Sequence, residues 1–376
     1  MHTVSSNVAN EGAYAVRLFR PDDRDSYLDL HETVFGHAGD AWFDWKFVDN
    51  PYFDHVPVVV AVDGDRVIGA KSGVGFEVAH EGLSLPALQP GDTMVHPEYR
   101  RQGVYSRMTE FMKEAYDGGP AALFFNYPNH ATLPGSLKHG WCEVGTVSTR
   151  YRVHNPVEFV ETSLGPVASV AEPVARAVVG GALRVARTRA PSDRTLTVRR
   201  HPLLPVETLA DLYRRSVPDR LHVVRDETYF DWRFGNPNWH YTAYTVERAG
   251  RPVLGAVVGR DATEGQSRAA LTEVLPLRSE RLHASAGERE RRDAETALLD
   301  RVLREFRDVD VVTAADGSIH ESVFSAFGFL PDTRPPLSMA ASPSTLVAYP
   351  LTPEVERIGF DSLDDWVVGL GDRDTN

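Results

Sequence analysis

The sequence carries one aromatic-rich signature twice. Residues 42–51 read WFDWKFVDNP, and residues 229–238 read YFDWRFGNPN, 187 positions further on (229 − 42). Each copy is followed by alternating apolar residues on both sides of a turn, at 56–76 and at 241–260, which is typical of a β-hairpin. Because the same elements follow each copy in the same order, the repeat predicts two related domains.

The elements after the hairpins also come in pairs. They are predicted as strands at 87–95 and 269–277, helices at about 104–117 and 288–307, and third strands at 121–128 and 308–316. We therefore expect an α/β (mixed α+β) fold with two domains, each a central mixed sheet flanked by helices. The predicted division is 14–155 for the first domain, 156–195 for a helical linker and 196–376 for the second domain.

Charge and composition narrow the function classes. The formal net charge of −13 disfavours capture of nucleic acid or anionic lipid by the surface as a whole. The single cysteine, Cys142, gives no disulfide framework, and it is expected to be a small buried hydrophobe. Residues 168–189 are too often charged for a membrane span, and the first residues lack a signal-peptide pattern. We expect a soluble cytoplasmic protein with no nucleic-acid or membrane partner, and the oligomeric state stays open.

The segment MVHPEYRRQGVYSRMTEFM, residues 94–112, joins a strand to a helix through a basic loop. Several backbone N–H groups and the positive end of a helix dipole converge at such a junction, which is how a fold binds a pyrophosphate with few side-chain charges. Arg100 and Arg101 add positive charge beside it. The segment therefore predicts a phosphate-binding loop in the first half.

This loop resembles that of the GNAT superfamily of acyl-CoA-dependent N-acyltransferases. The family pattern is Arg/Gln-x-x-Gly-x-Gly/Ala after a strand that ends in Val-x-Pro-x-Tyr/His. The matching residues are Val95, Pro97, Tyr99, Arg100 and Gly103, whereas Tyr105 stands at the last small position. The likeness covers residues 14–153, and it includes NYPNHATLPGSLKHGW (126–141), which corresponds to the family element that flanks the thioester.

The resemblance implies the GNAT fold and acetyl-CoA, or another acyl-CoA, as cosubstrate. The residues that it assigns to the cosubstrate are Met94, Val95, Arg100, Arg101, Gln102, Gly103, Val104, Tyr105 and Asn129. The tandem plan, with a closing pattern of Trp366, Asp372 and Asp374, is similar to a poorly characterised prokaryotic group of GNAT proteins.

The second half keeps the order of elements but not the basic loop. Its corresponding stretch reads RSERLHASAGERERRDAE (278–295), with Gly287 alone among Glu280, Glu288 and Glu290. Carboxylates at this place would repel a pyrophosphate. We therefore expect that the second domain has lost its cosubstrate and is retained for shape, acceptor binding or both.

The catalytic groups are less well defined by the sequence. Asp92 on the central strand is the first candidate for the general base, with Glu98 as the alternative, although Asp92 could equally be a turn or bulge residue. The resemblance implies a tyrosine as general acid, but that position is Ser136; Tyr127 and Tyr105 are possible substitutes. Backbone N–H groups at the end of the 92–95 strand would stabilise charge on the thioester oxygen.

The aromatic signature has two possible roles. Trp42, Asp44 and Trp45 could bind the acceptor, as early helices of GNAT domains do, or the aromatic side chains could pack on their own core, which the second copy favours. His96, His130 and His139 lack metal-ligand spacing, so no metal is expected.

These observations favour an enzyme, an N-acetyltransferase. It would transfer an acyl group, most simply acetyl, from CoA to a primary amine of a small molecule or peptide. The acceptor stays open among polyamines, amino sugars, antibiotics, amino acids and protein N-termini. Two alternatives remain: a tandem-GNAT aminoacyltransferase that uses charged tRNA, which the acidic chain and the intact RRQG loop disfavour, and a non-catalytic acyl-CoA-binding module.

Overall fold

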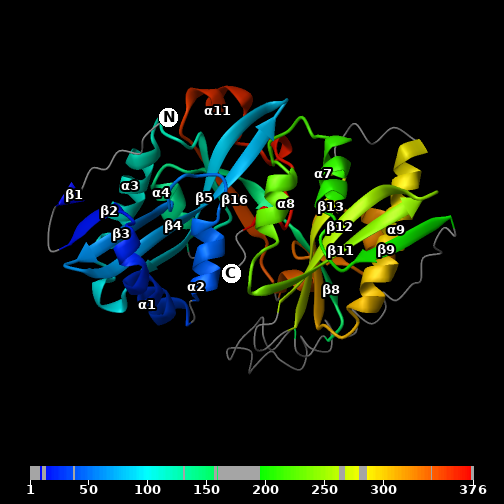
Figure 1. Cartoon of the computed structure of the whole chain (residues 1–376), viewed down its shortest axis with the longest axis horizontal. Helices are drawn as coiled ribbons and strands as arrows, with labels where there is room; N and C mark the ends of the chain where they lie inside the picture. Colours follow the sequence, from blue (N-terminus) through cyan, green and yellow to red (C-terminus); the bar gives the residue numbers. More distant parts are fainter. Residues whose placement is uncertain are drawn as a thin grey trace.

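The computed structural model describes residues 9–10, 14–36, 39–129, 132–155, 159, 195–261, 267–278, 286–339 and 341–373. His130, Glu280, Asp374 and nearly all of the predicted linker lie outside these residues. Figure 1 shows two α/β halves side by side, one built from the blue-to-cyan part of the chain and one from the green-to-orange part. Within the described residues, no helix is long and apolar enough to cross a bilayer.

The described strands form two mixed sheets. The first sheet has nine strands: β1 (Ala9–Asn10), β2 (Ala15–Leu18), β3 (Val58–Asp63), β4 (Arg66–His80), β5 (Leu83–Val95), β6 (Leu123–Asn126), β16 (Ser344–Pro350) and β7 (Cys142–Val147) in spatial order, with β10 (His222–Val223) paired to β4. The second has seven: β15 (Leu330–Pro331), β8 (Thr149–Val153), β14 (Val311–Ala315), β13 (Arg268–Leu275), β12 (Arg251–Asp261), β11 (Trp239–Arg248) and β9 (Leu196–His201).

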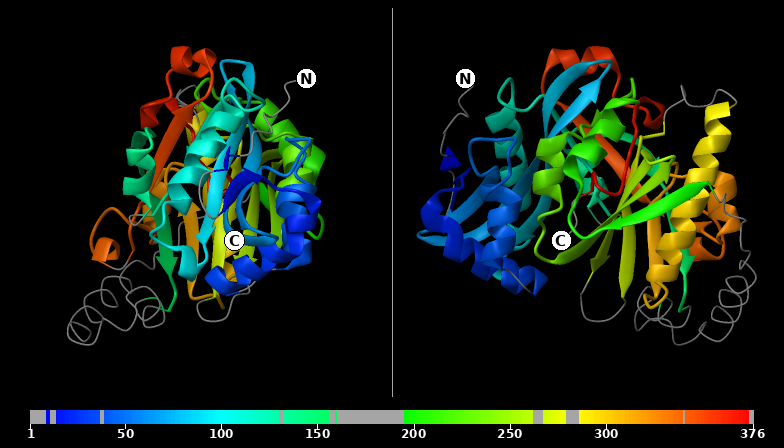
Figure 2. Two further views of the ribbon diagram at one scale, coloured as in Figure 1. Left: turned by 90° about the vertical axis from the view of Figure 1, so that its left-hand side faces the viewer. Right: turned by 45° about the vertical axis from the view of Figure 1, so that its right-hand side comes forward.

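The two halves exchange strands. β7 ends at Val147 in the first sheet, and β8 begins at Thr149 in the second sheet, where it pairs with β14. β16, from the far end of the chain, returns to the first sheet and lies between β6 and β7. The second view in Figure 2 shows this orange-red strand among the blue and cyan ones. The first sheet thus takes β10 and β16 from the second part of the sequence, and the second sheet takes β8 from the first part, so the predicted boundary near 155 does not separate the two sheets.

Helices cover both faces of each sheet. They are α1 (Arg24–Phe35), α2 (Asp40–Phe43), α3 (Val104–Tyr116), α4 (Leu133–Lys138), α7 (Val206–Arg214), α8 (Glu227–Arg233), α9 (Ala286–Glu305), α10 (Glu321–Ala326) and α11 (Pro353–Ile358). β3 is buried on both faces: Val59 and Ala61 pack in the α3 core, whereas Val58 and Val60 pack in a core that contains residues of both halves. A strand covered on both faces reads as a continuous apolar run, as VPVVVAV does.

The two aromatic signatures meet in this shared core. Trp45, in the π-helical turn Asp44–Val48 that follows α2, donates its Nε1–H to the carbonyl of Trp232 at 2.8 Å. Trp232 in turn donates its Nε1–H to the carbonyl of Trp45 at 2.8 Å, and the two rings stack with centroids 5.8 Å apart. The contact is reciprocal, as at an interface between two symmetric subunits. The repeated signature therefore joins the two halves.

We expect this pair to be energetically coupled. Trp45→Phe or Trp232→Phe keeps a ring but removes one N–H, which leaves a buried carbonyl without its donor and should cost about 1–3 kcal/mol in the free energy of unfolding. The double variant should deviate from additivity by at least about 0.5 kcal/mol in urea denaturation. Trp141→Phe, in the outer core of the first half, is the control. Its effect on the free energy of unfolding and that of Trp232→Phe should be additive. Simple additivity for Trp45 and Trp232 would contradict the coupling.

Candidate active site

A cavity of about 450 Å³ opens where β5 and β6 separate. The two parallel strands pair at Ala87 with Leu123 and at Leu88 with Phe124, and β5 then continues to Val95 without β6 beside it. The cavity is lined by five residues that the sequence singled out: Asp92, Tyr105, Tyr127, Asn129 and Ser136. It is also lined by residues that the sequence did not single out, including Lys71, Ser344 and Arg373.

The predicted phosphate-binding loop lies beside this cavity. Arg101 and Gly103 both adopt left-handed backbone conformations, with φ of +64° and +80°, and Gly103 is the N-cap of α3. The first N–H groups of a helix have no partner within it, and here the side of Gly103 that would carry a Cβ faces open space. Residues 100–103 are exposed. This exposed loop at a helix N-terminus suits an anionic ligand.

Lys71 is the buried cation of the cavity. Its Nζ lies 3.4 Å from Thr93 Oγ1 and 5.4 Å from the centroid of the Tyr105 ring. Burial lowers the pKa of Lys71 from the ordinary lysine value to about 8, because the charged form is poorly solvated there. No carboxylate forms an ion pair with it among the described residues. Lys71 can therefore exchange a proton near neutral pH.

Asp92 lies on a β-bulge of the central strand. The register between β4 and β5 shifts between Ala70 and Ser72, and Asp92 has a positive φ of +38°. Its carboxylate is nearly buried and is bound by Lys46 Nζ at 2.5 Å, and Lys46 belongs to the first aromatic signature. Asp92 is therefore a bulge residue that lines the cavity, and its role as general base stays a prediction.

The other predicted groups occupy different parts of the site. Tyr127 follows β6, and burial raises the pKa of its hydroxyl far above the ordinary tyrosine value. Tyr105 in the first turn of α3 packs beside Gly135, and burial also raises its pKa. Glu98, the alternative base, is exposed and lies beside Arg66 and His96, away from the cavity lining. Met94 is buried within the sheet.

The predicted acceptor residues have contacts elsewhere. Trp42 packs in the core with its ring 4.9 Å from Lys46 Nζ, Trp45 stacks on Trp232, and Asp44 pairs with Arg24 at 2.7 Å. Asp44 and Trp45 line a shallow groove at the junction of the halves rather than the cavity of Lys71. Acceptor binding by these residues stays a prediction, and their packing gives them a structural role. Among the described residues, no group of His, Cys, Asp and Glu is arranged to hold a metal ion.

Comparison with known proteins identifies the family. Residues 15–142 match the family model for the acetyltransferase (GNAT) domain, and this range contains the loop and most of the cavity. Residues 15–142 therefore form a GNAT domain. A search of curated proteins gave no significant match.

Solved structures share the fold over 90% of this chain. A GCN5-related N-acetyltransferase from Anabaena variabilis matches at a TM-score of 0.57 and 11% identity over 90% of this chain and 73% of that one. A probable N-acyltransferase from Enterococcus faecalis matches at a TM-score of 0.60 and 12% identity, over 90% of this chain and 72% of that one. A GCN5-related N-acetyltransferase from Kribbella flavida matches at a TM-score of 0.52 and 17% identity, over 90% of this chain and 72% of that one. At these identities the likeness establishes the fold alone.

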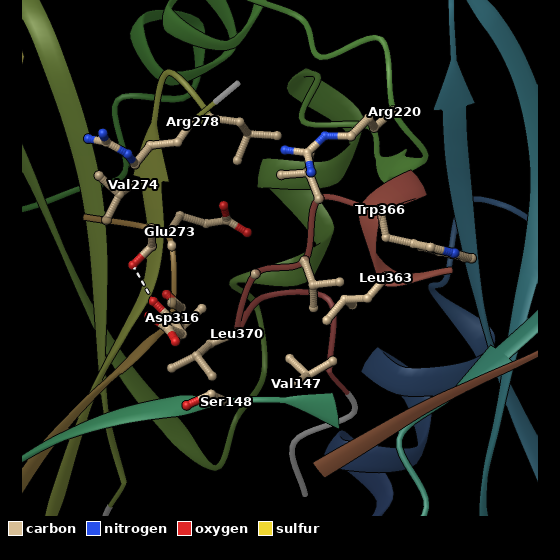
Figure 3. Close-up of a pocket in the computed structure, with 18 of the residues that line it drawn as sticks. Val147, Ser148, Arg220, Glu273, Val274, Arg278, Asp316, Leu363, Trp366 and Leu370 are labelled. Atoms are coloured by element: carbon tan, nitrogen blue, oxygen red, sulfur yellow. Dashed lines mark hydrogen bonds between the residues drawn. The ribbon is translucent and has the colours of Figure 1, made fainter. Parts of the chain in front are cut away.

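The second half of the chain has a cavity of about 440 Å³ at the end of β13 and β14 (Figure 3). Where the first half has its basic loop, Arg278 forms ion pairs with Glu288 at 2.6 Å and Glu295 at 2.7 Å. Inside the cavity, Glu273 pairs with the buried Arg225. Loss of the cosubstrate from the second half stays a prediction, since residues 279–285 of its corresponding loop lie outside the described part of the chain.

Lys71 and Arg373 are the charged cavity residues that sequence reasoning missed. Lys71 had a signal: it is the only charged residue in VIGAKSGVGF, a strand otherwise suited to burial. In the second half the corresponding position, opposite Glu273 in the register of β12 and β13, is the buried Val257. The fold therefore does not require a lysine there. Arg373 has no motif around it, and strand exchange brings its half of the chain to the site.

Proposed function

We propose that this GNAT protein transfers an acyl group, most simply acetyl, from acyl-CoA to a primary amine. The observation that carries the proposal is that an exposed loop at a helix N-terminus adjoins a cavity with a buried Lys71, which forms no ion pair with the described residues. Acyl-CoA supplies the activated acyl group when bound. Residues 100–104 would hold its pyrophosphate through backbone N–H groups and the two arginines.

The chain must then remove a proton from the acceptor. An amine with a pKa near 10.4 loses its proton at pH 7 at a cost of about 4–5 kcal/mol. Lys71 supports the role of general base because its pKa of about 8 leaves part of it neutral near physiological pH. Asp92, held by Lys46, would orient the acceptor amine or a water between the amine and Lys71.

Two further requirements are stabilisation of the charge on the thioester oxygen and protonation of the leaving thiolate. Backbone N–H groups freed by the bulge at Asp92 would stabilise negative charge on the thioester oxygen. The thiolate that leaves must gain a proton, and Tyr127 and Ser136 both line the cavity with hydroxyl groups. Because its pKa is raised, Tyr127 stays protonated at neutral pH and can donate a hydrogen bond.

The test is release of free CoA thiol from acetyl-CoA in the presence of an amine panel, with Lys71→Met as the variant. We expect kcat to fall about 10²- to 10⁴-fold, since this is what a general base contributes. In the wild type, kcat/KM should rise with pH through about 8, because Lys71 acts as a base only when it has lost its proton. The variant should lose this limb of the profile while it retains acetyl-CoA affinity.

Val257 shows that the sheet accepts an apolar residue at this position, so Lys71→Met should remain folded. A folded Lys71→Met variant with wild-type kcat and an unchanged pH profile would exclude Lys71 as the base. A wild-type protein that neither binds acetyl-CoA at millimolar concentration nor releases thiol would overturn the proposed function itself.

A further inference from the structure

Arg373 reaches the active-site cavity from the second half of the chain. Its Nη1 donates to Thr149 Oγ1 at 3.0 Å, and its Cζ lies 5.4 Å from the centroid of the Tyr127 ring. Its carbonyl accepts a bond from Arg233 Nη2 at 2.9 Å, and Arg233 is the counterpart of Lys46 in the second signature. The aromatic signature of one half thus positions a residue in the cavity of the other.

The remaining donors of Arg373 have no partner. Its Nε and Nη2 are buried and make no hydrogen bond within the described part of the chain. The neighbouring Asp372 carboxylate is bound by Arg225 and by the Gly369 N–H. Asp332, whose pKa is raised mainly by burial, accepts from Ser148 and Thr149. A buried guanidinium with unused donors is costly, which points to a partner that is bound during function.

The geometry of the unused atoms specifies the partner. Nε and Nη2 form one edge of the planar guanidinium, and their two N–H bonds point the same way. This edge matches the two oxygens of a carboxylate, which arginine binds through two parallel hydrogen bonds. The third nitrogen is already held by Thr149, so the side chain is fixed in place before the ligand arrives.

The charge of the cavity agrees with an anionic group on the acceptor. Of its charged lining residues, Arg373 is cationic, Lys71 is cationic until it loses its proton near pH 8, and the one acid, Asp92, is paired with Lys46. A polyamine or amino sugar would add positive charge to this cavity. A molecule with one amine and one carboxylate would add no net positive charge, because its carboxylate offsets the charge of Arg373.

We propose that Arg373 binds a carboxylate of the acceptor, so that the substrate class is an amino acid or a similar amine with a free carboxylate. This inference rests on the proposed acyltransferase function. Arg373 acts here as a specificity-determining residue contributed by the second half. It gives that half a part in acceptor binding without a cosubstrate of its own.

The experiment measures thiol release with a panel of free amino acids and their carboxamides, which keep the amine and lack the negative charge. The wild type should prefer the acids by about 10- to 100-fold in kcat/KM, the range expected for hydrogen bonds to a charged group. Arg373→Gln should remove this preference mainly by raising KM for the acids, and Arg373→Lys should restore part of it. The comparison of preferences between the two proteins cancels the different basicity of acids and amides.

Three outcomes would overturn the inference. The first is a wild type that turns over amines without preferring those with a carboxylate. The second is an Arg373→Gln variant whose kcat/KM falls equally for acids and carboxamides. The third is an Arg373→Gln variant whose acetyl-CoA affinity falls tenfold in calorimetry, which would assign Arg373 to the cosubstrate. Absence of both acetyl-CoA binding and thiol release in the wild type would overturn the proposed function, and the inference with it. Turnover without a carboxylate preference would overturn the inference alone.

Discussion

Gly103→Glu should abolish acetyl-CoA binding and leave the fold intact. The substitution places a carboxylate at the N-cap of α3, in the loop that is proposed to hold a pyrophosphate. Two unit charges 4 Å apart repel by about 4 kcal/mol at an effective dielectric constant of 20, which corresponds to about a thousandfold in affinity. The fold should persist because a Cβ at Gly103 meets no atom within 4 Å. Calorimetry with acetyl-CoA measures the affinity, and circular dichroism checks the fold.

Two controls separate charge from backbone strain and one half from the other. Gly103→Asn tolerates the left-handed conformation without adding charge, so it should cost far less affinity than the glutamate. Gly287→Glu is the matched change in the second half, at the exposed start of α9, and should leave affinity within about threefold. Equal loss in the two glutamate variants, both folded, would mean that both halves bind the cosubstrate.

The local elements of this fold could be read from the sequence because their signals are local. α3 begins at Val104 and ends at Tyr116, within a residue of its predicted range, because Gly103 supplies the left-handed N-cap and an apolar face follows at helical spacing. The β3–β4 hairpin follows from its Asp-Gly turn, where Gly64 has a φ of +60°. Each of these signals involves residues close together in the chain.

Strand exchange could not be read in the same way. The strands at 149–153 and 344–350 are not among the predicted elements, and alternation of apolar residues would not specify which sheet they join. The consequence for the site is direct, because Ser344 lies on the exchanged strand β16 and Arg373 is held by Thr149 of the exchanged strand β8. The same limit applies to Trp45, whose partner Trp232 is known only once the halves are placed together.

Lys71 and Asp92 show where local reasoning stops within one half. The sequence places both on predicted strands but singles out only Asp92 for the site. It does not show that Lys46 binds Asp92 or that Lys71 has no such acid among the described residues, since these facts depend on how α2 and its π-helical turn pack on the sheet. Our proposal therefore assigns the base to Lys71, on the grounds of charge pairing and of its lowered pKa.

Arg225→Met should destabilise the whole chain more than any exposed substitution. The Arg225 side chain is fully buried and forms ion pairs with Glu273 of β13 at 3.2 Å and with Asp372 of the C-terminal segment. Methionine would leave two buried carboxylates without their cation, and removal of one partner from a buried ion pair costs about 3–5 kcal/mol. The free energy of unfolding in urea measures the loss. Arg214→Met, at an exposed ion pair with Glu227, is the control and should leave the midpoint unchanged.

The pH dependence identifies the cause of that loss. Burial already raises the pKa of Glu273 in the folded state, and Arg225 opposes this shift, so Arg225→Met should raise that pKa further. A group whose folded pKa lies above its unfolded value contributes stability at low pH and loses it as the pH rises through the folded value. The defect of Arg225→Met should therefore shrink as the pH falls from 8 to 5. Adding Glu273→Gln and Asp372→Asn should recover most of the stability at pH 8. A defect that is equal at both pH values and unaffected by these two changes would assign the loss to packing, and the C-terminal segment that positions Arg373 would then be held by shape rather than by charge.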